Sequence, residues 1–525
     1  MKKFKMKRFK LGIFLLSLAA VSGCDEKVSK PFNFVEATIS QIQYAVKSGE
    51  TTCRAVVEGY ITRIDAYDKP NGIGAITVIN PNAVKKADEV DSAIKNGAPL
   101  PDLFCTPILV KDNYDTHDMI TTGGSIALKD SIPPDDAFMV RKLREAGAIV
   151  LAKTNMAEWA FSPRESVSSS FGRTANAYDT NFVPAGSSGG TASGIAASFG
   201  VAGLGSDTGN SIRGPSSHLA LFGIRSTIGL TSRDGIIPLA YDRDIAGPMT
   251  RTVEDGVRIF NIIAGYDETD PLTIPNMREE DYTKFLNIDG LKGKRLGVMR
   301  ALLDQKDSDP EITSLFMAAL EDLKAAGAII IDPLIVENFG FHKDNDEMYC
   351  PTFRYDMRNY LKSLGPDAPI NDVNEVLETG QHSPEAKGGL EYFKGFPKDI
   401  PPEEWDEPCQ RWPNSPSRQA YLEAVIIAMD DAKIDAIIYP GWNNPPAHID
   451  KANEEYKGDN SQVIAPATGL PAVVVPMGFW NNKLPAGLQI LGRPYSEGLL
   501  IELAYAYEQK TKHRRAPQGF DELNK

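Results

Sequence analysis

The sequence predicts an α/β protein with a parallel or mixed sheet covered by helices. An apolar segment, 106–113 (TPILVKDN), is followed by an amphipathic segment, 135–148 (DDAFMVRKLREAGA), and by a second apolar segment, 149–155 (IVLAKTN). A strand, a helix and a strand in this order form a βαβ unit. A third strand-like segment follows at 201–207 (VAGLGSD). The composition agrees, since 525 residues with 42% hydrophobic and 24% charged residues provide a large core and show no sign of disorder.

Two amphipathic helices are expected ahead of this unit. Apolar residues recur at helical spacing through 37–50 (ATISQIQYAVKSGE), where Gly49 provides the stop, and again through 51–68 (TTCRAVVEGYITRIDAYD). Both segments therefore predict helices with one buried face.

Residues 184–217 are rich in Gly, Ser and Ala, a composition typical of flexible linkers. A linker would not be bracketed by strand-like segments, however, and Ile195 and Phe199 lie one helical turn apart, so this part predicts a helix whose small residues allow close packing on the sheet. Ser187 then precedes a helix N-terminus, and Ser211 lies in a turn after a strand. Backbone N–H groups at both places can stabilise negative charge, which points to nucleophilic catalysis by a serine.

The pentapeptide 186–190 (GSSGG) fits G-x-S-x-G and would make Ser188 the nucleophile of an α/β-hydrolase. We reject this interpretation because the preceding residues, YDTNFVPA, form a polar loop, whereas a nucleophile elbow requires a strand there. A Ser-His-Asp triad would need a downstream histidine, and none lies in a supporting motif. His218 is expected to have a structural hydrogen-bonding role instead, which leaves lysine as the alternative base.

Several ordered segments make the chain similar to the amidase signature family. They are 107–113 (PILVKDN), 185–193 (AGSSGGTAS), 205–217 (GSDTGNSIRGPSS), 234–255 (DGIIPLAYDRDIAGPMTRTVED), 467–479 (ATGLPAVVVPMGF) and 484–494 (LPAGLQILGRP). The resemblance implies the amidase signature fold, a large mixed twisted β-sheet covered on both faces by helices, in a single domain over 36–525. It is weakest at about 265–430, where members of the family build their substrate pockets.

The resemblance implies a catalytic triad with Lys111 as base, Ser211 as nucleophile and Ser187 as the residue that bridges them. It also implies a cis peptide bond between Gly186 and Ser187. A lysine removes a proton only when it is neutral, and its ordinary pKa is near 10.4, so the pKa of Lys111 must fall by about three for the lysine to be neutral at pH 7. Burial at the end of the apolar strand PILV is the expected cause.

The oxyanion hole implied by the resemblance consists of backbone N–H groups of one loop, Thr208, Gly209, Asn210 and Ser211. The commoner family sequence has glycine at the position of Asn210. Because the donors are backbone groups, the hole survives this change, but the asparagine side chain occupies space at the site and is expected to alter substrate choice.

Three further residues are expected to support the site. Asp207 and Arg213 flank the nucleophile loop and are expected to brace it by charge-assisted hydrogen bonds. Ser188 is expected to hydrogen-bond within the site. Lys153 is a rival base by residue type, but the match to the family gives it a structural role.

Residues 1–23 resemble a bacterial lipoprotein signal peptide, with six positive charges before an apolar run too short to span a membrane. The ending AVSGC resembles a lipobox and implies cleavage before Cys24, lipidation of that cysteine and a tether over 24–35; an ordinary signal peptide is the alternative. Removing the six charges takes the formal net charge from −14 to −20. Such acidity argues against nucleic acid and anionic lipid as partners, so membrane attachment would be by the acyl chains alone.

Four cysteines would remain after processing. Cys53, Cys105, Cys350 and Cys409 could form up to two disulfides in an exported protein or be buried as small hydrophobic residues. Cys350 and Cys409, which flank one segment, are the favoured pair. No C-x-x-C motif is present and the six histidines are scattered, so the sequence predicts no metal and no cofactor.

The function predicted from the sequence is that of an exported serine amidase that converts a small-molecule carboxamide to an acid plus ammonia or an amine. One rival is an amidotransferase subunit that supplies ammonia for tRNA-linked transamidation, which the predicted export and the acidic surface disfavour. The other is a binding protein on an inactive scaffold, which the intact triad disfavours. The sequence leaves open the amide and the oligomeric state. Two aromatic-rich segments, 348–361 and 403–416, either line the substrate pocket or belong to the core.

Overall fold

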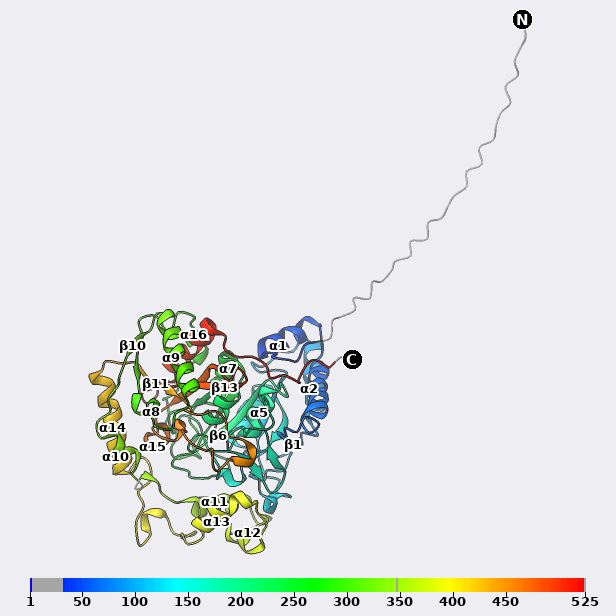
Figure 1. The fold of residues 1–525 in the computed structure, drawn as a ribbon. Helices are drawn as coiled ribbons and strands as arrows, with labels where there is room; N and C mark the ends of the chain where they lie inside the picture. Colours follow the sequence, from blue (N-terminus) through cyan, green and yellow to red (C-terminus); the bar gives the residue numbers. More distant parts are fainter. Residues whose placement is uncertain (2–31, 346–347, 524–525) are drawn as a thin grey trace. The chain divides into compact units, whose positions relative to one another are not determined.

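A computed structural model describes residues 1, 32–345 and 348–523 (Figure 1), so the predicted signal peptide, Cys24 and most of the predicted tether lie outside the described residues. The main sheet has eleven strands within these ranges. In chain order they are β1 (Ile76–Ile79), β2 (Thr106–Lys111), β3 (Ala148–Thr154), β6 (Ala202–Asp207), β7 (Phe222–Arg225), β8 (Ile245–Thr250), β9 (Arg295–Val298), β10 (Ile329–Ile331), β11 (Ala436–Pro440), β12 (Ala472–Trp480) and β13 (Leu484–Leu491). A separate hairpin consists of β4 (Ser166–Ser168) and β5 (Gly172–Thr174).

The sheet is mixed, as the sequence predicts. Its strand order is β1-β3-β2-β6-β8-β7-β12-β13-β11-β9-β10. Strand β2 runs parallel to both β3 and β6, whereas β8 and β12 pair antiparallel with their neighbours. The predicted βαβ unit is present as β2, helix α4 and β3. Strands β9 and β10, from the segment where the resemblance is weakest, extend the far edge of the sheet, a contribution that the sequence did not indicate.

The α-helices of the described residues account for most of the remaining regular structure. They are α1 (Ile39–Ser48), α2 (Cys53–Tyr67), α3 (Ala83–Lys95), α4 (Phe138–Glu145), α5 (Gly189–Ala196), α6 (Arg213–His218), α7 (Val253–Ile263), α8 (Arg300–Leu303), α9 (Pro310–Ala325), α10 (Phe339–Lys343), α11 (Phe353–Ser363), α12 (Asn374–Thr379), α13 (Pro384–Phe393), α14 (Pro416–Asp431), α15 (Ala465–Thr468) and α16 (Glu497–Thr511). Helices α1 and α2 are the two amphipathic helices predicted, and Gly49 ends α1 in the left-handed conformation at φ 75°.

Helices cover both faces of the sheet, and alternate residues of one strand show this. Ile438 of β11 packs in the same core cluster as Leu500 of α16. The preceding residue, Ile437, packs in a different cluster with Tyr421 of α14. Because successive strand side chains point to opposite faces, α16 and α14 lie on opposite sides of the sheet. The chain therefore has the large mixed sheet covered on both faces by helices that the resemblance implies.

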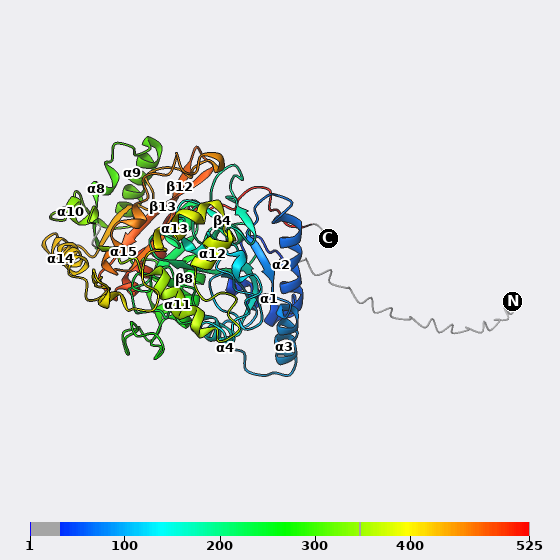
Figure 2. The same ribbon diagram turned by 90° about the horizontal axis from the view of Figure 1, so that it is seen from below.

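A third core cluster joins helices α11, α12 and α13, which lie together in both ribbon views (Figures 1 and 2). Phe353 of α11 packs there against Phe393 of α13 and against Trp159, which lies outside the variable segment. This contact fixes the three helices to the part of the chain that carries the predicted catalytic residues.

Two disulfides link the four described cysteines. Cys350 is bonded to Cys409, which confirms the favoured pair, and Cys53 is bonded to Cys105. The second bond joins the start of α2 to the residue immediately before β2. Among residues 32–345 and 348–523, no helix combines the length and the apolar character needed to cross a bilayer.

The predicted close packing of the small-residue helix is confirmed by α5. A Cβ atom at Gly190 would lie 2.3 Å from the backbone oxygen of Asn155, and one at Gly194 would lie 2.9 Å from the Leu109 side chain. Helix α5 therefore lies directly against the strands that hold the site, and its glycines set that spacing.

We expect Gly190→Ala to lower the free energy of unfolding by about 1–3 kcal/mol, because the backbone of Asn155 must move to admit the methyl group. Gly388→Ala is the matched control, since Gly388 lies in exposed α13 with no atom within 4 Å of the added carbon. That change should stabilise the protein by roughly 0.5–1 kcal/mol. Denaturant unfolding measures both, and equal effects at the two glycines would contradict the packing account.

Candidate active site

Lys111 ends strand β2, which lies between β3 and β6, and is fully buried. Its Nζ lies 2.7 Å from Ser187 Oγ and 2.8 Å from Ser206 Oγ. Asn113 holds Ser206 in turn, donating from Nδ2 to Ser206 Oγ at 3.0 Å. The structure thus brings together two of the three residues of the predicted triad. It adds Ser206 and Asn113, which the sequence did not single out although both lie within segments similar to the family.

Burial lowers the pKa of Lys111 to about 7, against the opposing influence of the Asp207 and Asp244 carboxylates. Removing an ammonium group from water destabilises its charged form, and the serine hydroxyls around Nζ do not compensate. Lys111 is therefore substantially neutral near pH 7. A neutral lysine can accept a proton from a hydroxyl, which is the property that the predicted mechanism requires.

Ser187 is placed by the turn that leads into α5. The cis peptide bond between Gly186 and Ser187, implied by the resemblance, is present. A side chain at Gly186 would meet the backbone oxygen of Ser162 at 2.3 Å, so only glycine fits this approach. Ser188 hydrogen-bonds within the site as expected, donating from Oγ to the Ser206 carbonyl at 3.2 Å.

Ser211 lies in the turn between β6 and α6 and is 4% exposed. With Thr208, Gly209 and Asn210 it lines a cavity of about 220 Å³. The backbone N–H groups of Gly209, Asn210 and Ser211 donate to no acceptor in the described part of the chain, so they are available to a group in the cavity. The Ser211 hydroxyl itself donates to Asn210 Oδ1 at 3.4 Å, and not to Ser187.

Asp207, at the end of β6, braces this turn as predicted. Its carboxylate accepts from Arg213 Nε at 3.0 Å and from Arg225 Nη1 at 2.9 Å, and all three side chains are fully buried. Although burial alone would raise the pKa of Asp207, the two guanidinium groups lower it to about 2. Arg213 also donates to the carbonyl of Gly209 at 2.6 Å, so the ion cluster holds the loop backbone itself.

The side chain of Asn210, the departure from the commoner family sequence, is turned into the protein. Its Nδ2 donates to Asp459 Oδ2 at 2.9 Å and to the Pro163 carbonyl at 3.1 Å. Burial raises the pKa of Asp459 to about 7. Asp459 belongs to no motif of the sequence analysis, since it lies far along the chain from the loop that it contacts.

The two alternative bases are held elsewhere. Lys153 Nζ donates to the Tyr114 carbonyl and to Thr121 Oγ1 and lies 3.8 Å from Asp112 Oδ1. Burial lowers the pKa of Lys153. The ring of His218 packs on Trp442, with 4.5 Å between ring centroids. The hydrogen-bonding role expected for His218 is wrong for Nδ1, which is buried without a partner among the described residues.

Comparison with known proteins shows which family the chain resembles. The family model described as Amidase matches residues 55–501. The chain belongs to the amidase family. It is 32% identical to a probable amidase of Arabidopsis thaliana, over 96% of this chain and 95% of that protein, and 30% identical to a glutamyl-tRNA(Gln) amidotransferase subunit of Synechococcus sp., over 92% and 99%. The solved structure of the peptide amidase of Stenotrophomonas maltophilia superposes with a TM-score of 0.81 at 32% identity, covering 93% of this chain and 99% of that one.

As an amidase-family enzyme the chain is a hydrolase of carbon–nitrogen bonds, and its cavities bear on the substrate. The 220 Å³ cavity at Ser211 has apolar walls from Ala160, Phe161, Pro163 and Leu239. Tyr349, from the variable segment, completes it together with Arg243. One aromatic of the segment 348–361 thus lines this cavity, whereas Phe353 of the same segment is core.

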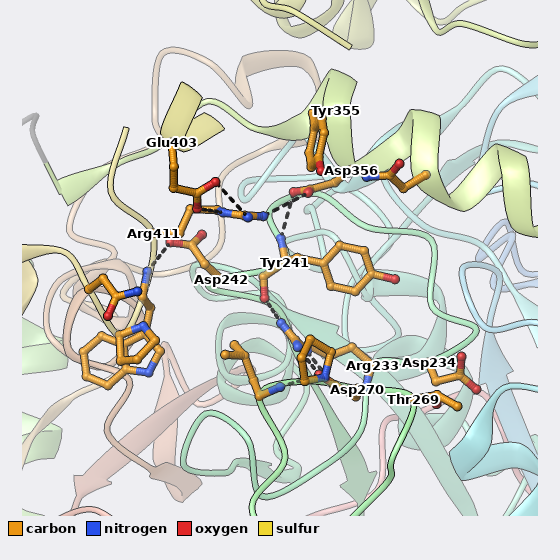
Figure 3. Close-up of a pocket in the computed structure, with 16 residues that line it drawn as sticks. Arg233, Asp234, Tyr241, Asp242, Thr269, Asp270, Tyr355, Asp356, Glu403 and Arg411 are labelled. Atoms are coloured by element: carbon orange, nitrogen blue, oxygen red, sulfur yellow. Dashed lines mark hydrogen bonds and ion pairs between the residues drawn. The ribbon is translucent and has the colours of Figure 1, made fainter. Parts of the chain in front are cut away.

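A larger cavity of about 430 Å³ lies on the other side of the loop 239–244 (Figure 3). Arg411 lies there between Glu403, 2.7 Å away, and Asp356, 3.9 Å away. Tyr241 and Asp242 of the loop line this cavity, whereas Leu239 and Arg243 line the smaller one. Since neither Ser211 nor Lys111 lines the larger cavity, we assign the chemistry to the smaller one despite its size.

One cluster has the residue types of a cation site. His117, Asp118 and Asp136 place their ligand atoms within 4.8 Å of one another, a grouping that the sequence analysis did not anticipate. Arg144 already pairs with both carboxylates, at 2.6 Å from Asp118 and 3.1 Å from Asp136. The cluster is accounted for as an ion-pair network, and we assign it no ligand.

Proposed function

We propose that the chain is a serine amidase that cleaves a carboxamide through an acyl-enzyme, with Ser211 as nucleophile, Ser187 as relay and Lys111 as base. The observation that carries this proposal is the buried contact of 2.7 Å between Lys111 Nζ and Ser187 Oγ. A lysine whose pKa is lowered to about 7 by burial and whose Nζ contacts a serine hydroxyl has the properties of a general base.

The proposed acylation begins when the Ser211 hydroxyl turns from Asn210 towards Ser187. Ser211 Oγ attacks the amide carbon while its proton passes to Ser187 Oγ and the Ser187 proton passes to Lys111 Nζ. The carbonyl oxygen becomes an oxyanion, which accepts hydrogen bonds from the backbone N–H groups of the loop that contains Thr208, Gly209 and Asn210. Fixed donors in a water-poor cavity stabilise this charge without reorganisation.

Collapse of the tetrahedral intermediate breaks the carbon–nitrogen bond. Lys111 returns its proton through Ser187 to the leaving nitrogen, which departs as ammonia or an amine and leaves the acyl group on Ser211. Water then attacks the ester while its proton passes through Ser187 to Lys111, and collapse of the second tetrahedral intermediate breaks the bond to Ser211 Oγ, which takes the proton back from Lys111 through Ser187. The products are a carboxylic acid and free Ser211, and no cofactor takes part.

A second candidate function is that of an ammonia-releasing amidotransferase subunit, because relatives named as glutamyl-tRNA(Gln) amidotransferase subunits match most of the chain. Their reaction concerns tRNA, and the formal net charge of −14 disfavours binding a polyanion. We therefore place free-standing hydrolysis first. Covalent labelling by a fluorophosphonate separates both functions from an inactive binding scaffold, which would not react.

Ser211→Ala should reduce turnover by at least about 10³-fold and abolish fluorophosphonate labelling, because it removes the attacking oxygen. The melting temperature should be unchanged, since the hydroxyl has only a long contact to Asn210. Ser217→Ala, which removes a buried hydroxyl without a hydrogen-bond partner, is the control and should retain activity. Full turnover by a folded Ser211→Ala variant would show that Ser211 is not the nucleophile.

The pH profile tests the base. Because Lys111 acts in its neutral form, kcat/KM should rise with pH through an ionisation at about 7, far below the ordinary lysine value. Lys111→Met should lose orders of magnitude in kcat while the protein remains folded. Lys153→Met should instead lower stability, because the Tyr114 carbonyl and Thr121 lose their donor. If Lys153→Met abolished turnover and Lys111→Met only lowered stability, Lys153 would be the base and Lys111 the structural lysine.

We further propose that the enzyme is exported and held on a membrane by acyl chains on Cys24, an inference from the sequence AVSGC. Each buried methylene contributes about 0.8 kcal/mol, so a multiply acylated cysteine is a sufficient anchor. Cys24→Ala should give a soluble, active enzyme or an unprocessed precursor, whereas the control Ser29→Ala should stay in the membrane fraction. Wild-type protein that is soluble after carbonate washing, with Cys24 unmodified by mass spectrometry, would refute the anchor.

A further inference from the structure

The cavity at Ser211 contains one positively charged side chain, Arg243, among the described residues that line it. The other walls are the apolar residues named above, the ring of Tyr349, the amide of Gln462 and the loop that contains Ser211. The Arg243 guanidinium lies over the Tyr349 ring, 5.5 Å from its centroid. The ring holds the cation at the cavity wall, and no carboxylate is among the described residues that line this cavity.

Arg243 makes no side-chain hydrogen bond or ion pair with any residue in the described ranges, and its Nε is a buried donor without a partner. Its backbone is fixed, because Arg243 N donates to the Ala240 carbonyl at 2.9 Å and the Arg243 carbonyl accepts from Arg225 at 2.8 Å. A buried Nε–H without an acceptor is costly, and a ligand or water in the cavity can supply that acceptor.

The acids next to Arg243 in the chain are already occupied. Asp242 accepts from Arg418 at 2.6 Å, on the side of the loop that faces the larger cavity (Figure 3). Asp244 accepts from Thr208 Oγ1 at 2.5 Å and from the backbone of Leu239 at 2.8 Å. Both carboxylates are thus held by partners other than Arg243, and Arg243 has no carboxylate partner among the described residues.

The neighbouring arginines lead to the same conclusion. Arg225 is paired with Asp207, and Arg418 with Asp242. The positive charge of Arg243 contributes to lowering the pKa of both arginines, after burial itself. A negative group bound at Arg243 would therefore relieve repulsion within the cluster as well as satisfy its donors.

We infer that Arg243 is a specificity-determining residue and that the substrate is an amide that also bears a carboxylate. This inference rests on the proposed function, because it takes Ser211 as the reacting residue. A carboxylate matches the planar donor fork of a guanidinium and can accept two parallel charge-assisted hydrogen bonds from it. The apolar walls then contact the short chain between the carboxylate and the scissile amide.

Matched substrates test the inference on the acyl side. Succinamate and butyramide differ only in a terminal carboxylate for a methyl group, as do glutaramate and valeramide. Ammonia release by the wild type should give kcat/KM at least tenfold higher for the acidic member of a pair. The ratio should fall to about one or below in Arg243→Gln and recover in part in Arg243→Lys. Arg411→Gln, which removes an arginine from the larger cavity, is the control and should keep the wild-type ratio.

Fluorophosphonate labelling distinguishes failure of this inference from failure of the proposed function. A neutral fluorophosphonate should label Ser211 in the wild type and in Arg243→Gln. Glutaramate should slow the labelling of the wild type more than valeramide does, and this difference should vanish in Arg243→Gln. Labelling that both compounds slow equally would overturn the role of Arg243 and leave Ser211 in place. No labelling of the folded wild type would overturn the proposed function, and the inference with it.

Discussion

The buried ion cluster of Asp207, Arg213 and Arg225 is the interaction on which the rest of the site depends. It joins the end of β6, the start of α6 and the end of β7, and Arg213 reaches the carbonyl of Gly209 within the loop. Removing one member of such a cluster leaves an uncompensated charge and typically costs about 3–5 kcal/mol. The position of Ser211 relative to β2 therefore follows largely from charge pairing below the loop, to which the side chains of Thr208 and Asn210 add hydrogen bonds.

Lys111 and Lys153 show that burial alone does not define a base. Both side chains are fully buried, and burial lowers the pKa of each. Lys153 donates to a backbone carbonyl and to the Thr121 hydroxyl and lies 3.8 Å from the Asp112 carboxylate, whereas the partners of Lys111 are two serine hydroxyls. A nearby carboxylate favours the charged form of Lys153, and the described structure places no carboxylate within ion-pair distance of Lys111. This difference in surroundings supports Lys111, and not Lys153, as the proposed base.

The sequence predicted those parts of the fold and site that local patterns determine. The βαβ unit and the small-residue helix α5 each follow from a contiguous motif, whereas the approach of Ser187 to Lys111 joins residues 76 apart and was expected only from the resemblance to the family. Asp459 was not predicted, because it reaches Asn210 across 249 residues and its sequence surroundings carry no signal. Tyr349 belongs to a segment for which the sequence left the choice between pocket and core open, and the structure places it at the cavity.

Arg243 lies within a segment similar to the family, yet its position is informative only when its partners are known. In the sequence alone, the neighbours Asp242, Arg243 and Asp244 suggest that the arginine pairs with one of the adjacent carboxylates. In the folded chain the two acids turn to Arg418 and Thr208, and the arginine is left facing the cavity. A segment with a net negative charge can therefore contribute a positively charged side chain to a cavity.

The disulfide between Cys350 and Cys409 has a consequence for how the variable segment can change. Cys350 follows Tyr349 of the small cavity, and Cys409 lies two residues before Arg411 of the large one, so the bond ties the two walls at a separation of 59 residues. A chain break within the intervening stretch would leave both walls covalently joined to each other. Insertions, deletions and proteolytic nicks in this stretch would leave that covalent link in place, while Phe393 of α13 reaches the small cavity through its contact with Phe161.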